Sequence, residues 1–305
     1  MPRLHAPLIL VLALAISLVT ATASASAGEG ESPRVVTTFS ILEDLARQVA
    51  GDHAQVTALT PVGAEVHEWE LTARNFAALE DADIVFYNGY NLEQWMGQVR
   101  ATTGGDTPIL AVAQRSEWST LPIVTGDMEG APDPHLWMDP RAAAAYARVM
   151  AEALAELVPE KADAFHERAD ALEADLKALH QELTETLKAI PEDDRTLVTS
   201  EAAFLYFADA YGFEHTGIWG TNSEEEGTPR QVAEVTDFIR ERQPRSLFWE
   251  STISDRHVRG ISGDTGIPYH GPLYVDSLSA PDGDAGTYTA MMRYNARMLV
   301  DKLAP

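Results

Sequence analysis

The sequence PEKADAFHERADALEADLKALHQELTETLKAI, residues 159–190, decides the architecture of this chain. Its apolar side chains fall three, four or seven residues apart, and Glu, Asp and Lys occupy most of the positions between them. These apolar positions are Phe165, Leu172, Leu176, Leu179, Leu183, Leu187 and Ile190. The spacing predicts one amphipathic helix of about 30 residues, which at 1.5 Å per residue is about 45 Å long. Such a helix can run along two lobes and restrict their relative motion.

A coiled-coil dimer is the alternative interpretation of this segment. The apolar stripe lasts barely four heptads, and the positions beside it lack consistent pairs of opposite charge. We therefore favour a connecting helix within one chain, and we expect the protein to be a monomer.

The segments on either side of the helix resemble one another at a constant offset of 162 residues. Thr37 corresponds to Thr199, and the apolar triplet 85–87 corresponds to 247–249. Each half shows strand and helix patterns in the same order, which indicates a duplicated architecture. Because strands alternate with helices, we predict an α/β fold of two lobes, each with a mainly parallel sheet flanked by helices.

The first 27 residues have the composition of a secretory signal peptide. Arg3 precedes an apolar run at 6–19, and the small residues Ala25-Ser26-Ala27 follow. This run has 14 residues, fewer than the about 20 that a membrane-spanning helix needs. The chain contains no cysteine, which excludes disulfides, zinc-thiolate sites and a lipid-modified cysteine. We therefore expect a periplasmic protein that is free and not lipid-anchored.

The rest of the chain divides into an N-terminal lobe at 28–158, the connecting helix at 159–190 and a C-terminal lobe at 191–305. Asp139-Pro140 and Thr228-Pro229 predict helix starts, because each pairs a capping side chain with a proline in the first turn. The net charge is −25, with 47 acidic and 22 basic residues. This balance argues against a nucleic-acid partner, since binding phosphates requires clustered Lys and Arg.

Two of the nine histidines occur where open α/β sheets bind ligands. His67 lies in the segment 61–70, after an apolar strand at 56–59, and His135 lies in 133–140, before a capped helix. Both are expected in loops at the edge of a sheet, where ligand-binding residues gather. Each segment also contains a tryptophan, which we expect to exclude water. A histidine with its polar atoms satisfied inside the fold is the alternative for each position.

Two acidic residues directly follow predicted strands. Glu201 comes after the strand at 197–200, and Asp276 comes after the apolar triplet 273–275. Taken alone, Glu201 most often serves as an anion in the first turn of a helix, and Asp276 most often caps a turn.

In this order, the segments resemble the cluster A-I (TroA-like) solute-binding proteins of manganese, zinc and iron ABC transporters. The resemblance implies two lobes bridged by a long rigid helix, with a single metal ion buried between them. By motif, His67 and His135 match the ligands from the N-terminal lobe, and Glu201 and Asp276 match those from the C-terminal lobe. The matching segments span nearly the whole chain after residue 27 and are 35–51, 61–70, 83–88, 133–140, 200–207, 248–251 and 273–278.

The resemblance implies a binding protein, not an enzyme, that carries one divalent ion to an inner-membrane permease with a cytoplasmic ATPase. Relatives that resemble zinc-uptake proteins usually have histidine where Glu201 stands, and segment 118–133 contains no histidine. A carboxylate in place of an imidazole gives a harder ligand set. We therefore favour Mn²⁺ as the transported ion, with Fe²⁺ possible and a zinc-specific protein as the alternative.

A secreted mononuclear metalloenzyme is the alternative from a different functional class. Such an enzyme needs an open coordination position and a nearby general base, whereas four protein ligands favour holding an ion. The sequence contains no HExxH pair, GxSxG elbow or P-loop. A sugar, amino-acid or peptide binder is a third class, and it would need a wide cleft.

Overall fold

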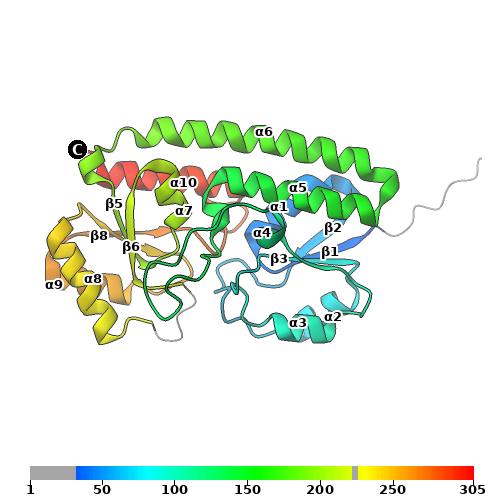
Figure 1. Cartoon of the computed structure of the whole chain (residues 1–305), viewed down its shortest axis with the longest axis horizontal. Coiled ribbons are helices and arrows are strands. Elements are labelled where there is room, and N and C mark those ends of the chain that lie inside the picture. Colours follow the sequence, from blue (N-terminus) through cyan, green and yellow to red (C-terminus); the bar gives the residue numbers. More distant parts are fainter. Residues whose placement is uncertain (1–31, 222–225) are drawn as a thin grey trace, which may run out of the picture. The chain divides into compact units, whose positions relative to one another are not determined.

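The computed structural model describes residues 32–221 and 226–305. The predicted signal peptide at 1–27 lies outside these residues. In the described ranges, no helix is both long enough and apolar enough to span a bilayer. The elements are those of an α/β protein, with one set of parallel strands before the long helix and a second set after it (Figure 1). This confirms the predicted fold class.

The first half contains one sheet of four parallel strands in the order β2-β1-β3-β4. Val35 and Phe86 face the main core, whereas the alternate residues Val36 and Val85 face a second core. Both faces of the sheet are therefore covered, as is usual for parallel sheets. The elements are β1 (Arg34–Thr37), α1 (Ser40–Ala50), β2 (Gln55–Ala58), α2 (Ala73–Glu80), β3 (Ile84–Tyr87), α3 (Met96–Thr102), β4 (Ile109–Ala111) and α4 (Val112–Arg115).

The second half repeats the alternation of strands and helices but does not form one sheet. β5 pairs with β6 and β7 pairs with β8, all in parallel, and the described residues show no strand ladder between β5 and β7. The prediction of parallel strands is confirmed, whereas the single sheet expected here is split in two. The elements are β5 (Thr196–Glu201), α7 (Leu205–Tyr211), β6 (Glu214–Trp219), α8 (Pro229–Arg242), β7 (Leu247–Glu250), α9 (Arg256–Thr265), β8 (Tyr269–Leu273) and α10 (Tyr288–Leu303).

The long helix is α6 (Ala162–Leu187), which has 26 residues. It is shorter than the predicted segment because Pro159–Lys161 form a separate 3₁₀ turn. It packs against α5 (Pro140–Leu157) and α1 from the first half and against α10 from the second (Figure 1). Its apolar stripe is buried in one main core that contains side chains from both halves. The helix therefore joins the two halves by packing as well as by chain connection.

Local signals in the sequence set several helix boundaries, and the starts of α5 and α8 are those predicted. Asp139 accepts a hydrogen bond from the backbone N–H of Arg141 at the start of α5. Thr228 and Gln231 form a reciprocal capping box at the start of α8. Gly51 ends α1 with a φ of 55°, a left-handed conformation that glycine adopts without strain.

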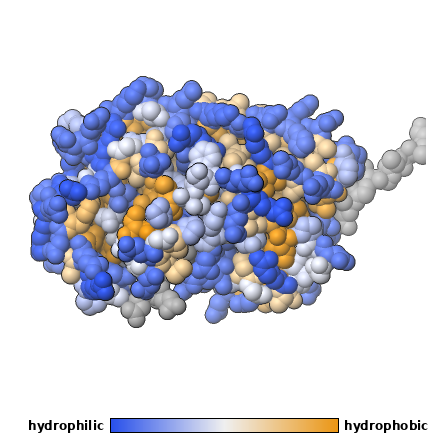
Figure 2. All heavy atoms as spheres, viewed as in Figure 1, coloured by the Kyte–Doolittle hydropathy of each residue, from blue (hydrophilic) through white to orange (hydrophobic). Residues whose placement is uncertain are grey.

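The face shown in Figure 2 is mainly hydrophilic, with apolar patches between the hydrophilic side chains. Such a surface fits the 47 acidic residues of the chain. The large apolar side chains exposed in the described ranges are Val62, Phe76, Val124 and Met128.

Candidate metal centre

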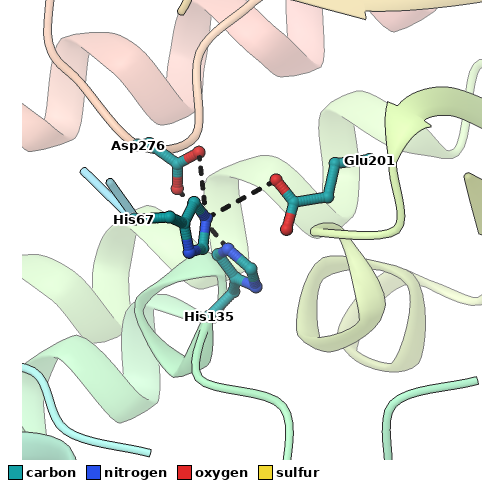
Figure 3. A group of neighbouring side chains, drawn as sticks. All are labelled: His67, His135, Glu201 and Asp276. Atoms are coloured by element: carbon teal, nitrogen blue, oxygen red, sulfur yellow. Dashed lines mark ion pairs between the residues drawn. The ribbon is translucent and has the colours of Figure 1, made fainter. Parts of the chain in front are cut away.

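Four side chains from four separate segments converge at one point (Figure 3). They are His67, His135, Glu201 and Asp276, the residues selected in the sequence, and all four are buried. His67 lies between β2 and α2, and His135 directly precedes the 3₁₀ helix η2 (Leu136–Met138). Glu201 ends β5, and Asp276 follows β8. Each half therefore contributes two of the four side chains.

The distances between these donor atoms suit coordination of one ion. One ligand atom from each residue lies within 4.8 Å of the other three. His67 Nε2 lies 3.5 Å from Glu201 Oε2 and 3.9 Å from an Asp276 oxygen, and His135 Nε2 lies 3.5 Å from the other Asp276 oxygen. Two atoms that each bind an ion at about 2.1 Å lie up to about 4.2 Å apart. The three measured separations fall below that limit, and the 4.8 Å that bounds the whole group exceeds it by about 0.6 Å, so the side chains need to move only slightly to bind one ion.

Several of these atoms have no hydrogen-bond partner within residues 32–221 and 226–305. They are His135 Nε2, Glu201 Oε1 and both carboxylate oxygens of Asp276. A buried polar atom left without a partner costs about 1–3 kcal/mol. Burying these unpaired atoms together therefore destabilises the metal-free protein. A cation bound at their centre would interact with all of them and remove this cost.

The electrostatics of the centre favour positive charge. Burial lowers the pKa of His135, but Asp133 and Asp276 outweigh this effect and raise the pKa to about 10. Burial also lowers the pKa of His67, yet Glu201 and other carboxylates raise it well above its ordinary value. In Asp276, burial raises the pKa, but the two histidines lower it further than burial raises it. The carboxylates around the centre therefore stabilise positive charge there, either as a bound metal ion or as protons on the two imidazoles.

His135 is oriented by a fully buried carboxylate, Asp133. Asp133 Oδ1 accepts a hydrogen bond from the backbone N–H of His135 at 2.9 Å and lies 3.2 Å from its Nδ1. Its other oxygen accepts a hydrogen bond from Thr221 Oγ1, in the second half, at 3.1 Å. With Nδ1 directed at Asp133, Nε2 faces the centre, an arrangement typical of metal-binding histidines. Asp133 lies in the segment 133–140 that drew attention to His135, but no pattern along the chain predicts this role for it.

Hydrogen bonds between the halves fix the loops that carry His135 and Asp276. Trp137 Nε1 donates to the backbone oxygen of Val275 at 2.9 Å, and Tyr288 donates to the backbone oxygen of Trp137 at 2.6 Å. The buried Trp137 ring packs on His135 and excludes water there, as expected.

The tryptophan near His67 behaves differently from the prediction. Trp69 packs against the second core and donates a hydrogen bond to Asn75 Oδ1 at 3.1 Å. Trp95, which carried no prediction, instead donates to the backbone oxygen of Val66 at 2.7 Å, beside His67. The expectation that Trp69 shields His67 was wrong because α2 offers this indole a polar partner and an apolar face.

A narrow pocket of about 40 Å³ reaches the centre from one side. Neither His135 nor Asp276 lines it. This volume admits an ion or a few water molecules, whereas sugars and peptides occupy pockets of about 300–1,000 Å³. The pocket is lined by Glu65, His67, Glu68, Gln94, Glu201, Trp219 and Glu226.

Comparison with known proteins identifies the family. The family model described as "Zinc-uptake complex component A periplasmic" (ZnuA) matches residues 35–302. The chain belongs to this family. It is 40% identical over 271 residues to the iron-binding protein YfeA of Yersinia pestis, covering 89% of this chain and 85% of YfeA. It is 35% identical over 271 residues to the manganese-binding lipoprotein MntA of Halalkalibacterium halodurans, covering 89% and 88%.

Solved structures of the family share the fold. The periplasmic zinc-binding protein TroA from Treponema pallidum has a TM-score of 0.82 at 29% identity, covering 90% of this chain and 100% of TroA. The Mn-bound periplasmic metal-binding protein from Candidatus Liberibacter asiaticus has a TM-score of 0.80 at 28% identity, covering 88% and 98%. The predicted resemblance is confirmed: this is a substrate-binding protein of the metal ABC transporter family. The relatives are named for iron, manganese and zinc, so the family does not identify one metal.

The expectation of a freely secreted protein is contradicted by these comparisons. MntA and the streptococcal relatives SsaB and SloC are named as lipoproteins, which points to a lipid-anchored location. The expectation rested on the absence of a cysteine, since the composition of 1–27 does not separate free from anchored proteins. The sequence contains no cysteine, and the comparison identifies no attachment residue in it.

Proposed function

We propose that this chain is the binding component of an ABC importer and captures one divalent transition-metal ion as cargo. The ligands are His67, His135, Glu201 and Asp276, and the ion passes to a permease driven by an ATPase. The observation that carries the proposal is the convergence of four buried donor groups from four segments within 4.8 Å.

The charges of this ligand set match a divalent ion. Two neutral imidazoles and two carboxylates neutralise a charge of +2, which lowers the cost of burying the ion. Either carboxylate can bind through one or two oxygens, so the coordination number can rise from four to six. Two oxygen-donor side chains favour Mn²⁺, with Fe²⁺ next, although affinity at a given site rises from Mn²⁺ towards Zn²⁺. A zinc-specific protein is therefore the alternative within the family.

The small pocket supports a carrier over a metalloenzyme. A catalytic metal needs an open coordination position and space for a substrate. Here four protein groups surround the centre, and the pocket of about 40 Å³ holds no more than a few water molecules. The group as a whole is arranged to hold an ion.

We propose two lobes, at 28–158 and 191–305, joined by the helix segment 159–190. Each lobe supplies half of the ligands. A small separation of the lobes would therefore break the ligand set, which offers the permease a way to release the ion. The packing of α6 against helices of both halves supports a small movement over a wide opening. We also propose that the protein acts as a monomer.

Elemental analysis and titration calorimetry test this function directly. We expect the purified protein to bind about one Mn²⁺, Fe²⁺ or Zn²⁺ ion per chain, with a rise in melting temperature on loading. Competition between Mn²⁺ and Zn²⁺ at controlled free concentrations measures the preference. No bound transition metal and no thermal shift with any of the three ions would refute the proposal.

A further inference from the structure

A buried carboxylate occupies the gap between the two small sheets of the second half. β5 and β7 lie side by side, yet no strand ladder joins them in the part of the chain that the structure describes. Glu250, the last residue of β7, is fully buried beside this gap. Its Oε2 accepts a hydrogen bond from the backbone N–H of Ser200, and its Oε1 accepts one from Glu201, both at 3.1 Å. One carboxylate therefore binds two successive amides of β5.

These two hydrogen bonds require a local departure from strand geometry. In a regular strand, successive N–H groups point to opposite neighbours, so they cannot both reach the same carboxylate. The ladder between β5 and β6 pairs Thr199 and Glu201 but omits Ser200, and the Thr199 hydroxyl donates to the backbone oxygen of Glu201. These contacts imply a local turn of the backbone at Ser200-Glu201, which presents two N–H groups to the Glu250 carboxyl group. This turn sets the direction in which the Glu201 side chain leaves β5.

The first half supports a ligand from the equivalent position by different means. Asn88 precedes Glu250 by 162 residues, the offset that relates the two halves. Asn88 Nδ2 donates to the backbone oxygen of Pro134 at 2.9 Å, directly before His135. Asn88 directly follows the third strand of its half, and Glu250 ends the third strand of the other. Each residue is buried and polar, and each holds the segment that carries a proposed ligand.

We propose that Glu250 is a positioning residue for Glu201: it holds the turn at Ser200-Glu201 and so directs the Glu201 carboxylate to the metal centre. This inference rests on the proposed function, in which Glu201 binds the ion. The competing explanation is that Glu250 only joins the two sheets and contributes to stability without affecting Glu201.

A double-mutant cycle separates these explanations. Glu250→Gln keeps the size of the side chain but presents an amide NH₂ to one backbone N–H. We expect it to weaken Zn²⁺ and Mn²⁺ binding about 10- to 100-fold in calorimetric or chelator-competition titrations. In a Glu201→Ala background, we expect the same substitution to weaken binding by less than about threefold, because the group that it positions is gone. Equal losses in both backgrounds, or no loss in Glu250→Gln alone, would overturn the inference.

A matched control distinguishes positioning from general loosening. Glu173 is buried on α6 and accepts hydrogen bonds from Arg148 and Lys177, neither of which is a proposed ligand or holds a segment that carries one. We expect Glu173→Gln to lower the melting temperature while changing metal affinity by less than about threefold. An affinity loss equal to that of Glu250→Gln would contradict a specific role for Glu250.

Two further measurements keep the test decisive. If circular dichroism shows that Glu250→Gln does not fold, Glu250→Asp replaces it in the cycle, since it retains a carboxylate that can reach one amide. The visible spectrum of bound Co²⁺ should change in the Glu250 variant and stay unchanged in Glu173→Gln. If the wild-type protein binds no ion, the proposed function itself is refuted. If the wild-type protein and the Glu250 variant bind the ion equally well, only this inference is refuted.

Discussion

The four proposed ligands form an inner pair and an outer pair, and the two pairs are held differently. His135 and Asp276, the inner pair, lie away from the pocket, and hydrogen bonds that cross between the halves fix their loops. His67 and Glu201, the outer pair, line the pocket, and their backbone N–H groups are held by Glu65 and Glu250 within the same half. The inner pair is therefore the more firmly fixed, and we expect an ion to enter and leave past the outer pair.

The largest expected effect comes from the inner pair. His135→Ala removes an inner ligand and leaves Asp133 and Asp276 buried without the imidazole between them, so we expect an affinity loss of about 10²- to 10³-fold in Kd, or about 3–4 kcal/mol. Zinc titration calorimetry measures this loss. His166→Ala, at an exposed position of α6, is the control and should bind like the wild type. Tight binding by His135→Ala would end the assignment of an inner ligand.

The outer histidine should matter less. His67 lines the pocket, so in His67→Ala a water molecule can enter and take the vacated coordination position. We expect Kd to rise about 10- to 100-fold with an unchanged circular dichroism spectrum. A loss as large as that of His135→Ala would erase the distinction between the two pairs.

Proton competition should sharpen the comparison. The pKa of His135 in the metal-free protein is raised from 6.5 to about 10. Protonation of His135 therefore stabilises the folded, metal-free protein fully below about pH 6.5. This stabilisation is lost as the pH rises through about 10. A metal ion requires the neutral imidazole. Affinity should therefore increase up to about tenfold per pH unit between pH 6.5 and pH 10, with protons released on binding. Calorimetry in buffers of different ionisation enthalpy counts these protons, and a pH-independent affinity without proton release would contradict imidazole coordination.

The smallest expected effect concerns the rate of entry. Glu68 is exposed and lines the pocket beside the outer pair. We expect Glu68→Gln to slow metal association about two- to threefold at low ionic strength and to leave dissociation unchanged, because the long-range attraction is reduced. High salt should abolish the difference. Glu80→Gln, at the exposed end of α2, is the control in stopped-flow measurements, and an equal change there would point to net charge alone.

Local patterns in the sequence predicted the helical framework well. The apolar spacing of α6 and the caps at Asp139 and Thr228 each depend on residues a few positions apart, so the sequence displays them directly. The position of each candidate ligand at the end of a strand or in a loop singled it out, but only the family resemblance joined the four into one set, because no spacing along the chain relates residue 67 to residue 276.

The supporting residues could not be predicted in the same way. Glu250 acts on backbone amides 50 positions away, and Thr221 meets Asp133 across 88 positions, so only the folded chain brings these groups together. The split between β5 and β7 has the same origin, because a side chain takes the place of backbone carbonyls there. Trp69 was misjudged since its partner is the cap of the next helix and not the neighbouring histidine.

The shared core beneath α6 has a consequence for how the protein loses its structure. Side chains before and after this helix belong to one continuous apolar cluster, from Val35 to Leu303. Heat should therefore melt the molecule in a single cooperative transition, and a fragment ending before α6 should be insoluble because its covering leucines are missing. A chimaera that takes one half from a relative would have to keep the apolar face of α6 complementary to both halves. Substitutions on this face are therefore expected to depend on residues in both halves.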